Sequence, residues 1–123
     1  MFSFFTAKEA NDALPDVIKK FEYSLAKKND ITKIEKELQL TVSTTNSFEK
    51  YMELKQKLNT AITKFYQSIE ILESTGVMIK SIDQGLLDFP SKRFDEEVCL
   101  CWKHGETEIK FWHDRESGFM GRK

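Results

Sequence analysis

The sequence has few of the residues and motifs that usually mark a catalytic or binding site. Its 123 residues include two cysteines, two histidines, two tryptophans, two prolines and five glycines. There is no phosphate-binding glycine-rich loop, no Gly-x-Ser-x-Gly and no His-Glu-x-x-His motif. The sequence therefore lacks the common signatures of nucleotide-binding proteins, serine hydrolases and zinc peptidases.

Long hydrophobic runs and an excess of charge of one sign are also missing. No apolar stretch approaches the ~18 residues of a membrane-spanning helix, and the apolar start Met-Phe-Ser-Phe-Phe lacks the basic residues of a signal peptide. The formal net charge is −1, so nucleic acid is not an expected partner. Two closely spaced cysteines without an export signal indicate reduced thiols and a cytoplasmic location.

The composition is that of a globular protein with a sizeable core. Hydrophobic residues make up 40% of the chain and charged residues 32%. This length is typical of one domain that can fold without disulfides or metals. We expect a single α+β domain over residues 1–123, with a long antiparallel helical hairpin in residues 1–75. A small antiparallel β-rich module is expected in residues 76–123.

The beginning of the chain predicts a long helix with a capped start. Thr6 and Glu9 have the spacing of a capping box, in which each side chain accepts a hydrogen bond from the other residue's amide. Apolar residues then recur at helical spacing over residues 15–42. A polar stretch at residues 27–30 interrupts this pattern. Either one long helix bends there or Asp30 begins a new one.

A second helix of similar length is predicted over residues 47–74. Asn46 and Glu49 give a capping signal before it, and Gly76 ends it. Two long helices joined by a short loop predict an antiparallel hairpin about 40 Å long. Such a hairpin leaves much of its apolar surface uncovered, so we expect a homo-oligomer, with a dimer formed by helix packing. The alternative is that the first arm folds back over the second at its break.

The residues after the helices show short strand and turn patterns. Residues 77–80 favour a strand and residues 83–85 a turn. Asp88-Phe89-Pro90 is predicted to close a loop, and residues 91–96 are polar and irregular. The first strands of the module are therefore weakly defined by the sequence.

Two alternating runs, residues 98–102 and 107–112, predict a β-hairpin. A two-residue turn at His104 and Gly105 fits between them, because glycine readily adopts the positive φ that such a turn requires. Directly opposite residues share a face of the sheet. The predicted pairs on the apolar face are Trp102 with Thr107, Leu100 with Ile109, and Val98 with Phe111, followed by His113.

This register separates both cysteines from His113. Cys99, Cys101 and Trp112 fall on the opposite face, with Glu108 beside the two thiols. Cys-x-Cys with one carboxylate is a weak metal-ligand pattern, because closed zinc sites have four ligands. We therefore predict no cofactor and expect the partly buried thiols to fill gaps beneath a covering loop.

Five other residues are candidates for a role in function. His113 is either a general base or ligand, or a buried histidine hydrogen-bonded to a carboxylate such as Asp88. Trp102 is most simply part of the core. Trp112 either packs under another segment or contributes to a binding surface, where tryptophan is enriched. Arg122 either returns to a carboxylate or belongs to a frayed terminus.

Short motifs along the chain resemble those of one protein family. They are Phe5-Thr6, Glu9-Ala10, Leu14-Pro15, Gly76-Val77, Lys80, Gly85-Leu86, Asp88-Phe89-Pro90, Leu100-Cys101-Trp102, Gly105-Glu106, Trp112-His113, Gly118-Phe119 and Arg122. Together they resemble a family of small uncharacterised prokaryotic proteins, domain-of-unknown-function family 2203. The resemblance implies no activity. It marks Asp88, Glu106, His113 and Arg122 as the polar candidates, and of the two cysteines only Cys101 lies in a matching motif.

Two functions remain open at this point. The first is a non-enzymatic cytoplasmic module that self-associates through its helices and binds a protein or small molecule through Trp112. The second is an enzyme in which Asp88, Glu106 and His113 perform acid/base or metal-assisted hydrolysis. The first is favoured, because no catalytic motif accompanies these residues.

Overall fold

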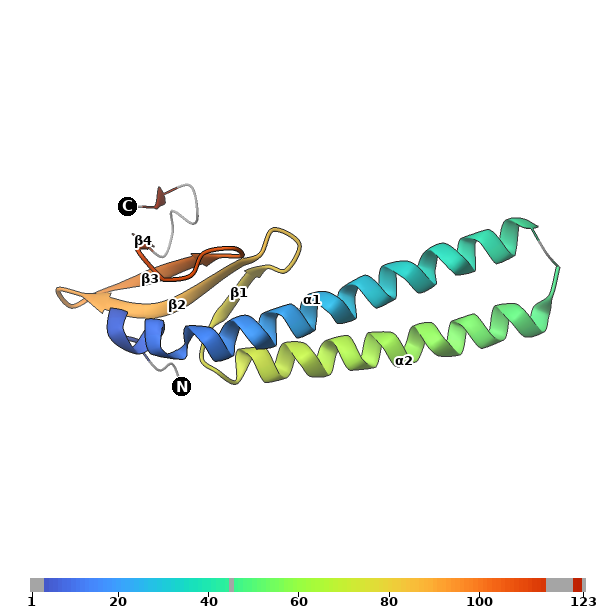
Figure 1. The fold of residues 1–123 in the computed structure, drawn as a ribbon, viewed down its shortest axis with the longest axis horizontal. Helices are drawn as coiled ribbons and strands as arrows, with labels where there is room; N and C mark the ends of the chain where they lie inside the picture. Colours follow the sequence, from blue (N-terminus) through green and yellow to red (C-terminus); the bar gives the residue numbers. More distant parts are fainter. Residues whose placement is uncertain (1–3, 45, 115–120, 123) are drawn as a thin grey trace.

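The computed structural model describes residues 4–44, 46–114 and 121–122. Their elements are α1 (Ala7–Thr44), α2 (Phe48–Glu73), β1 (Met78–Ser81), β2 (Leu86–Arg93), β3 (Glu96–Lys103) and β4 (Phe111–Asp114). The described strands form one antiparallel sheet in the order β1-β2-β3-β4. The fold is α+β, as predicted, with a helical hairpin followed by an antiparallel sheet (Figure 1).

Helix α1 is continuous through the polar stretch at residues 27–30. The capping box at its start is confirmed. Thr6 Oγ1 accepts from the Glu9 amide at 3.1 Å, and Glu9 Oε1 accepts from the Thr6 amide at 2.9 Å. Asp30 is an exposed residue inside the helix rather than the start of a new one. A polar turn is tolerated there because this part of the helix packs on one neighbour only, which leaves its other faces in water.

Helices α1 and α2 pack side by side and extend well beyond the sheet (Figure 1). The buried line of α2 contains Leu54, Ala61 and Ser68, which lie seven residues apart on one face. The small side chains of Ala61 and Ser68 allow close approach of the two helices. In α1, the described residues after Ser24 include none that is buried. Within the part of the chain that the structure describes, no helix has the length and apolar character to cross a membrane.

The start of α2 differs from the prediction by one residue. Ser47, not Asn46, is the N-cap, and its hydroxyl accepts from the Lys50 amide at 3.2 Å. Both residues can cap a helix, and the choice depends on where the first helical turn begins. Gly76 follows the end of α2 with φ of 100°, which glycine adopts without a Cβ clash.

Strand β2 is the largest departure from the sequence prediction. Residues 88–96, predicted as a loop and an irregular stretch, belong to β2, to the start of β3 and to the tight turn between them. That turn is formed by Phe94 and Asp95, with positive φ values of 52° and 68°. Pro90 is tolerated because its nitrogen and carbonyl point to the edge away from β3. At that edge its carbonyl accepts from the Phe5 amide at 2.7 Å.

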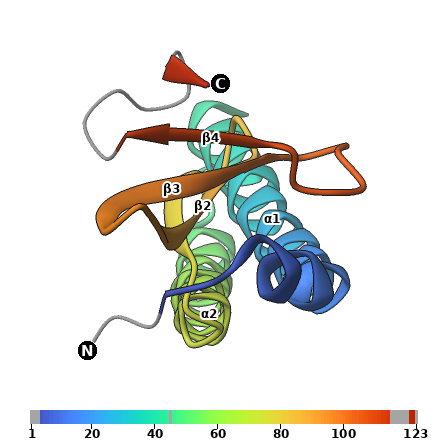
Figure 2. The ribbon, with the colours of Figure 1, turned by 90° about the vertical axis from the view of Figure 1, so that its left-hand side faces the viewer.

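The core lies between one face of the sheet and the base of the hairpin (Figures 1 and 2). Phe21 of α1 meets Trp102 of β3 edge to face, with ring centroids 5.3 Å apart. Leu87 and Phe89 of β2 are fully buried in the same cluster. The described C-terminal residues 121–122 lie on the opposite side of the sheet (Figure 2). The sheet therefore has one face against the helices and a second, separate face.

Candidate functional site

Strands β3 and β4 pair in a register that differs from the predicted one. The observed pairs are Val98 with Asp114, Cys99 with His113, Leu100 with Trp112, and Cys101 with Phe111. The predicted partner of Val98 was Phe111. The observed partner is Asp114, which lies three residues after Phe111. A displacement by an odd number of residues reverses the face of every β4 side chain. The prediction that His113 and the cysteines lie on opposite faces is therefore wrong.

The turn itself was correctly located, and the error lies in the residues after it. The Glu106 amide donates to the Lys103 carbonyl at 3.0 Å, which closes a turn over His104 and Gly105. Gly105 has φ of 105°, as this position requires. The chain then leaves the ladder and rejoins it only at β4.

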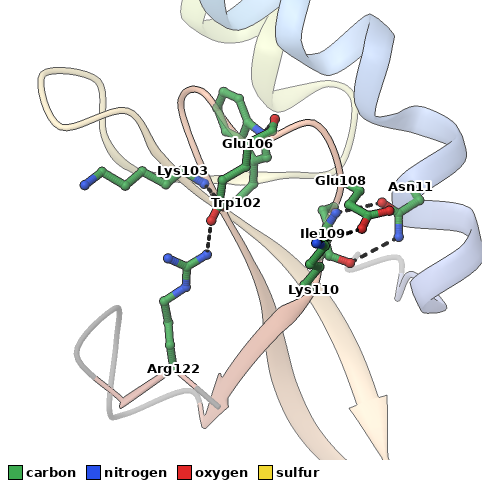
Figure 3. A network of polar contacts seen from close by, with 8 residues as sticks. All are labelled: Asn11, Trp102, Lys103, Glu106, Glu108, Ile109, Lys110 and Arg122. Carbon is green, nitrogen blue, oxygen red and sulfur yellow. Dashed lines mark hydrogen bonds and ion pairs between the residues drawn. The ribbon is translucent and has the colours of Figure 1, made fainter.

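Contacts to the core explain why the chain leaves the ladder. Ile109, 7% exposed, is part of the core cluster. Its amide donates to Asn11 Oδ1 at 2.7 Å, and its carbonyl accepts from Asn11 Nδ2 at 3.3 Å (Figure 3). The indole Nε1 of Trp102 donates to the Glu106 carbonyl at 2.9 Å. These contacts hold the loop against α1 and β3. The anchored residues therefore stay outside the ladder, and β4 begins further along the chain than predicted.

On the sheet face that points away from the helices, three side chains of different chemistry converge. Asp88 of β2 lies opposite Cys101 of β3, and His113 of β4 lies opposite the neighbouring Cys99. One possible ligand atom from each of Asp88, Cys101 and His113 lies within 4.8 Å of the other two. Their exposed fractions are 2%, 1% and 1%. We refer to these three residues as the Asp-Cys-His cluster.

Both ring nitrogens of His113 have an oxygen partner. Nδ1 lies 2.8 Å from the backbone carbonyl oxygen of Asp114, and Nε2 lies 3.0 Å from Oδ1 of Asp88. A carbonyl oxygen can only accept, so Nδ1 carries a proton and donates it. Nε2 therefore faces a carboxyl oxygen, and that hydrogen bond requires a further proton on the ring or on Asp88. Of the two alternatives for His113, the structure shows the contact with the Asp88 carboxylate.

The second carboxyl oxygen of Asp88 is buried and has no hydrogen-bond partner among the described residues. The Lys80 ammonium lies nearby, with its Nζ 3.9 Å from Oδ2. Lys80 is 47% exposed, so this ion pair is shared with solvent and contributes little. A buried carboxyl oxygen without a full partner is costly, and such groups often mark a functional site.

Burial favours the neutral thiol form of Cys101. Burial is the main cause that raises the pKa of its thiol from 9.0 to about 11; the Arg122 guanidinium opposes this rise, and Asp88 and Glu106 add to it. A cysteine nucleophile needs the opposite environment, in which an imidazolium stabilises a thiolate. Both His113 nitrogens already face oxygen atoms. The cluster therefore does not have the arrangement of a cysteine-dependent active site.

We expect Cys101 to be almost unreactive in the folded protein. At about pH 8, a pKa near 11 lowers the thiolate fraction about 100-fold relative to an ordinary thiol, and burial blocks access as well. The Cys99→Ala variant leaves Cys101 as the only thiol, so its rate of modification by a thiolate-selective reagent can be measured with and without denaturant. The rate should be at least ~100-fold slower in the folded protein. Rapid modification of the folded variant would contradict the observed burial.

Glu106 makes its contacts at the turn rather than in the Asp-Cys-His cluster. Its carboxylate accepts from the Lys103 amide at 2.7 Å and from the Arg122 guanidinium at 2.6 Å (Figure 3). The same guanidinium lies 4.0 Å from the ring centroid of Phe111. Arg122 thus returns to a carboxylate, as one of the two sequence alternatives had it. Of the three residues proposed for acid/base chemistry, only Asp88 and His113 are in contact.

The remaining candidates lie apart from the cluster. Glu108 is exposed in the loop and pairs with Lys110 at 3.1 Å, so its predicted position beside the cysteines is wrong because it followed from the predicted register. Trp102 is completely buried in the core. Trp112 is half-buried, with the Arg93 guanidinium 4.6 Å from its ring centroid. Trp112, which contacts Arg93, is therefore more accessible to solvent than Trp102.

Three residues with a role in positioning the site were not found by sequence reasoning. Asn11 anchors the loop, Lys80 approaches Asp88, and Arg93 covers Trp112. Lys80 was noted only as part of the family resemblance, with no partner assigned, and Asn11 and Arg93 belong to no motif and contact residues far away in sequence. Such contacts become visible only once the strand register is known.

The fold and the site define a small α+β protein with a long helical hairpin, a four-stranded sheet and a buried Asp-Cys-His cluster on the outer face of that sheet. The chain belongs to the uncharacterised conserved protein family DUF2203, whose sequence profile matches residues 3–123. The resemblance noted in the sequence is thereby confirmed, although its Gly118-Phe119 motif lies outside the described residues. No curated protein and no solved structure matches the chain.

Proposed function

We propose that the protein is a non-enzymatic, cytoplasmic interaction module that pairs with a second copy through the distal half of its hairpin, residues 29–44 and 48–63. The observation that carries this proposal is the extended shape. The accessible surface is 8352 Å², whereas a compact monomer of 14.4 kDa exposes about 6,800 Å². The projecting part of the hairpin contributes to this excess of about 1,500 Å² (Figure 1).

The distal half of the hairpin has few buried residues and several exposed apolar side chains. Among its described residues only Leu54 and Ala61 are buried. At its tip Leu40, Val42 and Phe48 are 65%, 62% and 72% exposed. Clustered exposed apolar side chains on a projecting element are typical of protein interfaces. A second hairpin would supply the missing half of a four-helix core.

Area and charge favour a second copy of this chain as the partner. A stable interface buries about 800 Å² per partner, which the excess surface can supply. The distal half carries five lysines and five acidic residues, so its net charge is zero. Two copies would therefore meet without overall repulsion, and oppositely charged residues can pair across the interface.

The alternative, a hydrolytic enzyme, receives less support from the geometry. Asp88 and His113 are only 2% and 1% exposed, and Glu106 is bound to Arg122. A substrate would need to displace the covering residues to reach the pair. The cytoplasmic location rests on two buried cysteines that are not joined in a disulfide.

We expect the protein to have twice the chain mass of 14.4 kDa in solution, as measured by sedimentation or light scattering. Charge repulsion should weaken the dimer of Leu40→Glu/Phe48→Glu at least tenfold, because buried apolar anchors contribute about 1–2 kcal/mol or more each. The helical circular dichroism signal should persist, since both side chains are exposed in the single chain.

The matched control is Phe94→Glu. Phe94 is 91% exposed and lies in the β2–β3 turn, at the opposite end of the molecule from the hairpin tip (Figure 1). This variant should remain a dimer. A wild-type protein that stays monomeric at all concentrations would contradict the proposal, as would a double variant that dimerises like the wild type.

A further inference from the structure

A proton shared between His113 and Asp88 does not give every polar atom of the Asp-Cys-His cluster a hydrogen-bond partner. Nδ1 of His113 already donates to the Asp114 carbonyl, so the 3.0 Å contact between Nε2 and Asp88 Oδ1 requires one further proton or a metal ion between these two atoms. Two acceptor atoms at this distance need a cation between them. A proton would satisfy Nε2 and Oδ1, but it would leave Asp88 Oδ2 buried without a hydrogen bond.

The orientation of His113 is typical of a metal-binding histidine. In most such sites the ring nitrogen that does not touch the metal donates to a carboxylate or a backbone carbonyl, which fixes the tautomer and the ring. The hydrogen bond from His113 Nδ1 to the Asp114 carbonyl, 2.8 Å long, has this role. It turns Nε2 toward Asp88.

The donor atoms lie at distances close to those between three ligands of a tetrahedral zinc site, whose fourth position would be taken by a water. Zinc bonds of about 2.0–2.3 Å place neighbouring donor atoms roughly 3.3–3.7 Å apart. The three donor atoms of the cluster already lie within 4.8 Å of one another, and one pair is 3.0 Å apart. Side-chain adjustments of about an ångström or less would bring all three to bonding distance.

The donor chemistry and the burial select the ion. A thiolate sulfur excludes the hard ions Mg²⁺ and Ca²⁺, and a mixed nitrogen, oxygen and sulfur set suits Zn²⁺. A divalent ion with one thiolate, one carboxylate and one neutral imidazole gives a site of zero net charge. Such neutrality matters, because an uncompensated buried charge is very costly. These three residues are buried to 98% or more.

From these observations we infer that Asp88, Cys101 and His113 bind one Zn²⁺ ion on the outer face of the sheet. The ion would link β2, β3 and β4 through one side chain each. Metal binding of this kind stabilises the folded sheet, because the complete ligand set exists only when the three strands are paired. This site is independent of the hairpin interface and of whether the protein forms a dimer.

Cobalt is a direct probe of this site, because Co²⁺ bound by a thiolate shows a near-ultraviolet charge-transfer band and intense visible bands. The purified protein is stripped with a chelator and titrated with Co²⁺, and Zn²⁺ is then added in competition. We expect one Co²⁺ per chain, a thiolate band, and displacement by Zn²⁺. Absence of the thiolate band at saturating Co²⁺ would overturn the inference.

The chain offers an internal control for the thiol ligand and for the imidazole ligand. Cys101→Ala should remove the thiolate band and weaken Zn²⁺ binding at least ~100-fold, whereas Cys99→Ala should change the affinity less than about threefold. His113→Gln should weaken binding similarly, whereas His104→Gln should not, since His104 lies in the turn. Equal binding by Cys99→Ala and Cys101→Ala would show that the metal lies elsewhere.

Two further measurements separate this inference from other effects. Circular dichroism of each variant identifies any loss of fold, and the wild-type cobalt spectrum does not depend on a variant at all. The hairpin variant Leu40→Glu/Phe48→Glu should bind Zn²⁺ with wild-type affinity. Failure of dimerisation and failure of metal binding are therefore distinguishable.

Discussion

Replacement of Trp102 by alanine is expected to lower the free energy of unfolding by about 3–5 kcal/mol. Trp102 is fully buried and meets Phe21 edge to face at 5.3 Å. Its indole Nε1 also donates to the Glu106 carbonyl at 2.9 Å, so the substitution removes this bond as well as a large packing volume. Domains of this size are stable by about 5–15 kcal/mol. The loss would therefore be a large fraction of the total stability.

The second tryptophan provides the matched control. Trp112 is half-buried and its ring contacts the Arg93 guanidinium, so Trp112→Ala should cost about 1 kcal/mol. Urea unfolding followed by circular dichroism measures both variants without relying on tryptophan fluorescence. Trp102→Phe should fall between them, because it keeps most of the packing and loses the hydrogen bond. Equal costs for the two alanine variants would contradict the assignment of Trp102 to the core.

The helical part of the fold could be predicted from the sequence because its signals are local. The capping residues Thr6 and Glu9 and the helical spacing that follows depend on neighbours within a few positions. Continuity at residues 27–30 could not be predicted, because it depends on packing against α2. The N-cap was placed at Asn46 rather than Ser47 since neighbouring polar residues compete for that role.

Strand β2 was missed because its sequence contains residues that favour loops. Pro90 normally argues against a strand, and it is tolerated here only because its free edge meets Phe5 instead of another full strand. Asp88 has a polar side chain in a completely buried position. Both features require knowledge of distant parts of the chain.

The candidate site shows the same division between local and distant signals. The contact of His113 with Asp88 was one of the two predicted alternatives, because a buried histidine needs a hydrogen-bond partner. The position of Cys101 beside His113 was not predicted. The face on which His113 lies depends on the number of residues in the loop before β4. That number is fixed by Ile109 and Asn11, which are far apart in sequence.

The Asp88–His113 pair is expected to show strong energetic coupling in the metal-free protein. Replacing either residue alone by alanine leaves the other buried without its partner, which costs about 3–5 kcal/mol. The double variant should cost much less than the sum of the two, with a coupling free energy of about 2 kcal/mol or more. Asp88→Asn should be milder than Asp88→Ala, because the amide can donate to the Nε2 lone pair.

The matched control is the other histidine–carboxylate pair, His104 with Glu22, whose atoms lie 3.6 Å apart at the surface. Its side chains are 40% and 58% exposed, so its coupling should be below about 0.5 kcal/mol. Urea unfolding in the presence of a chelator measures both cycles. Equal coupling in the two pairs would show that burial does not strengthen the Asp88–His113 contact. Repeating the buried cycle with Zn²⁺ should stabilise the wild type alone, because a ligand that binds only the complete cluster adds its binding free energy to folding.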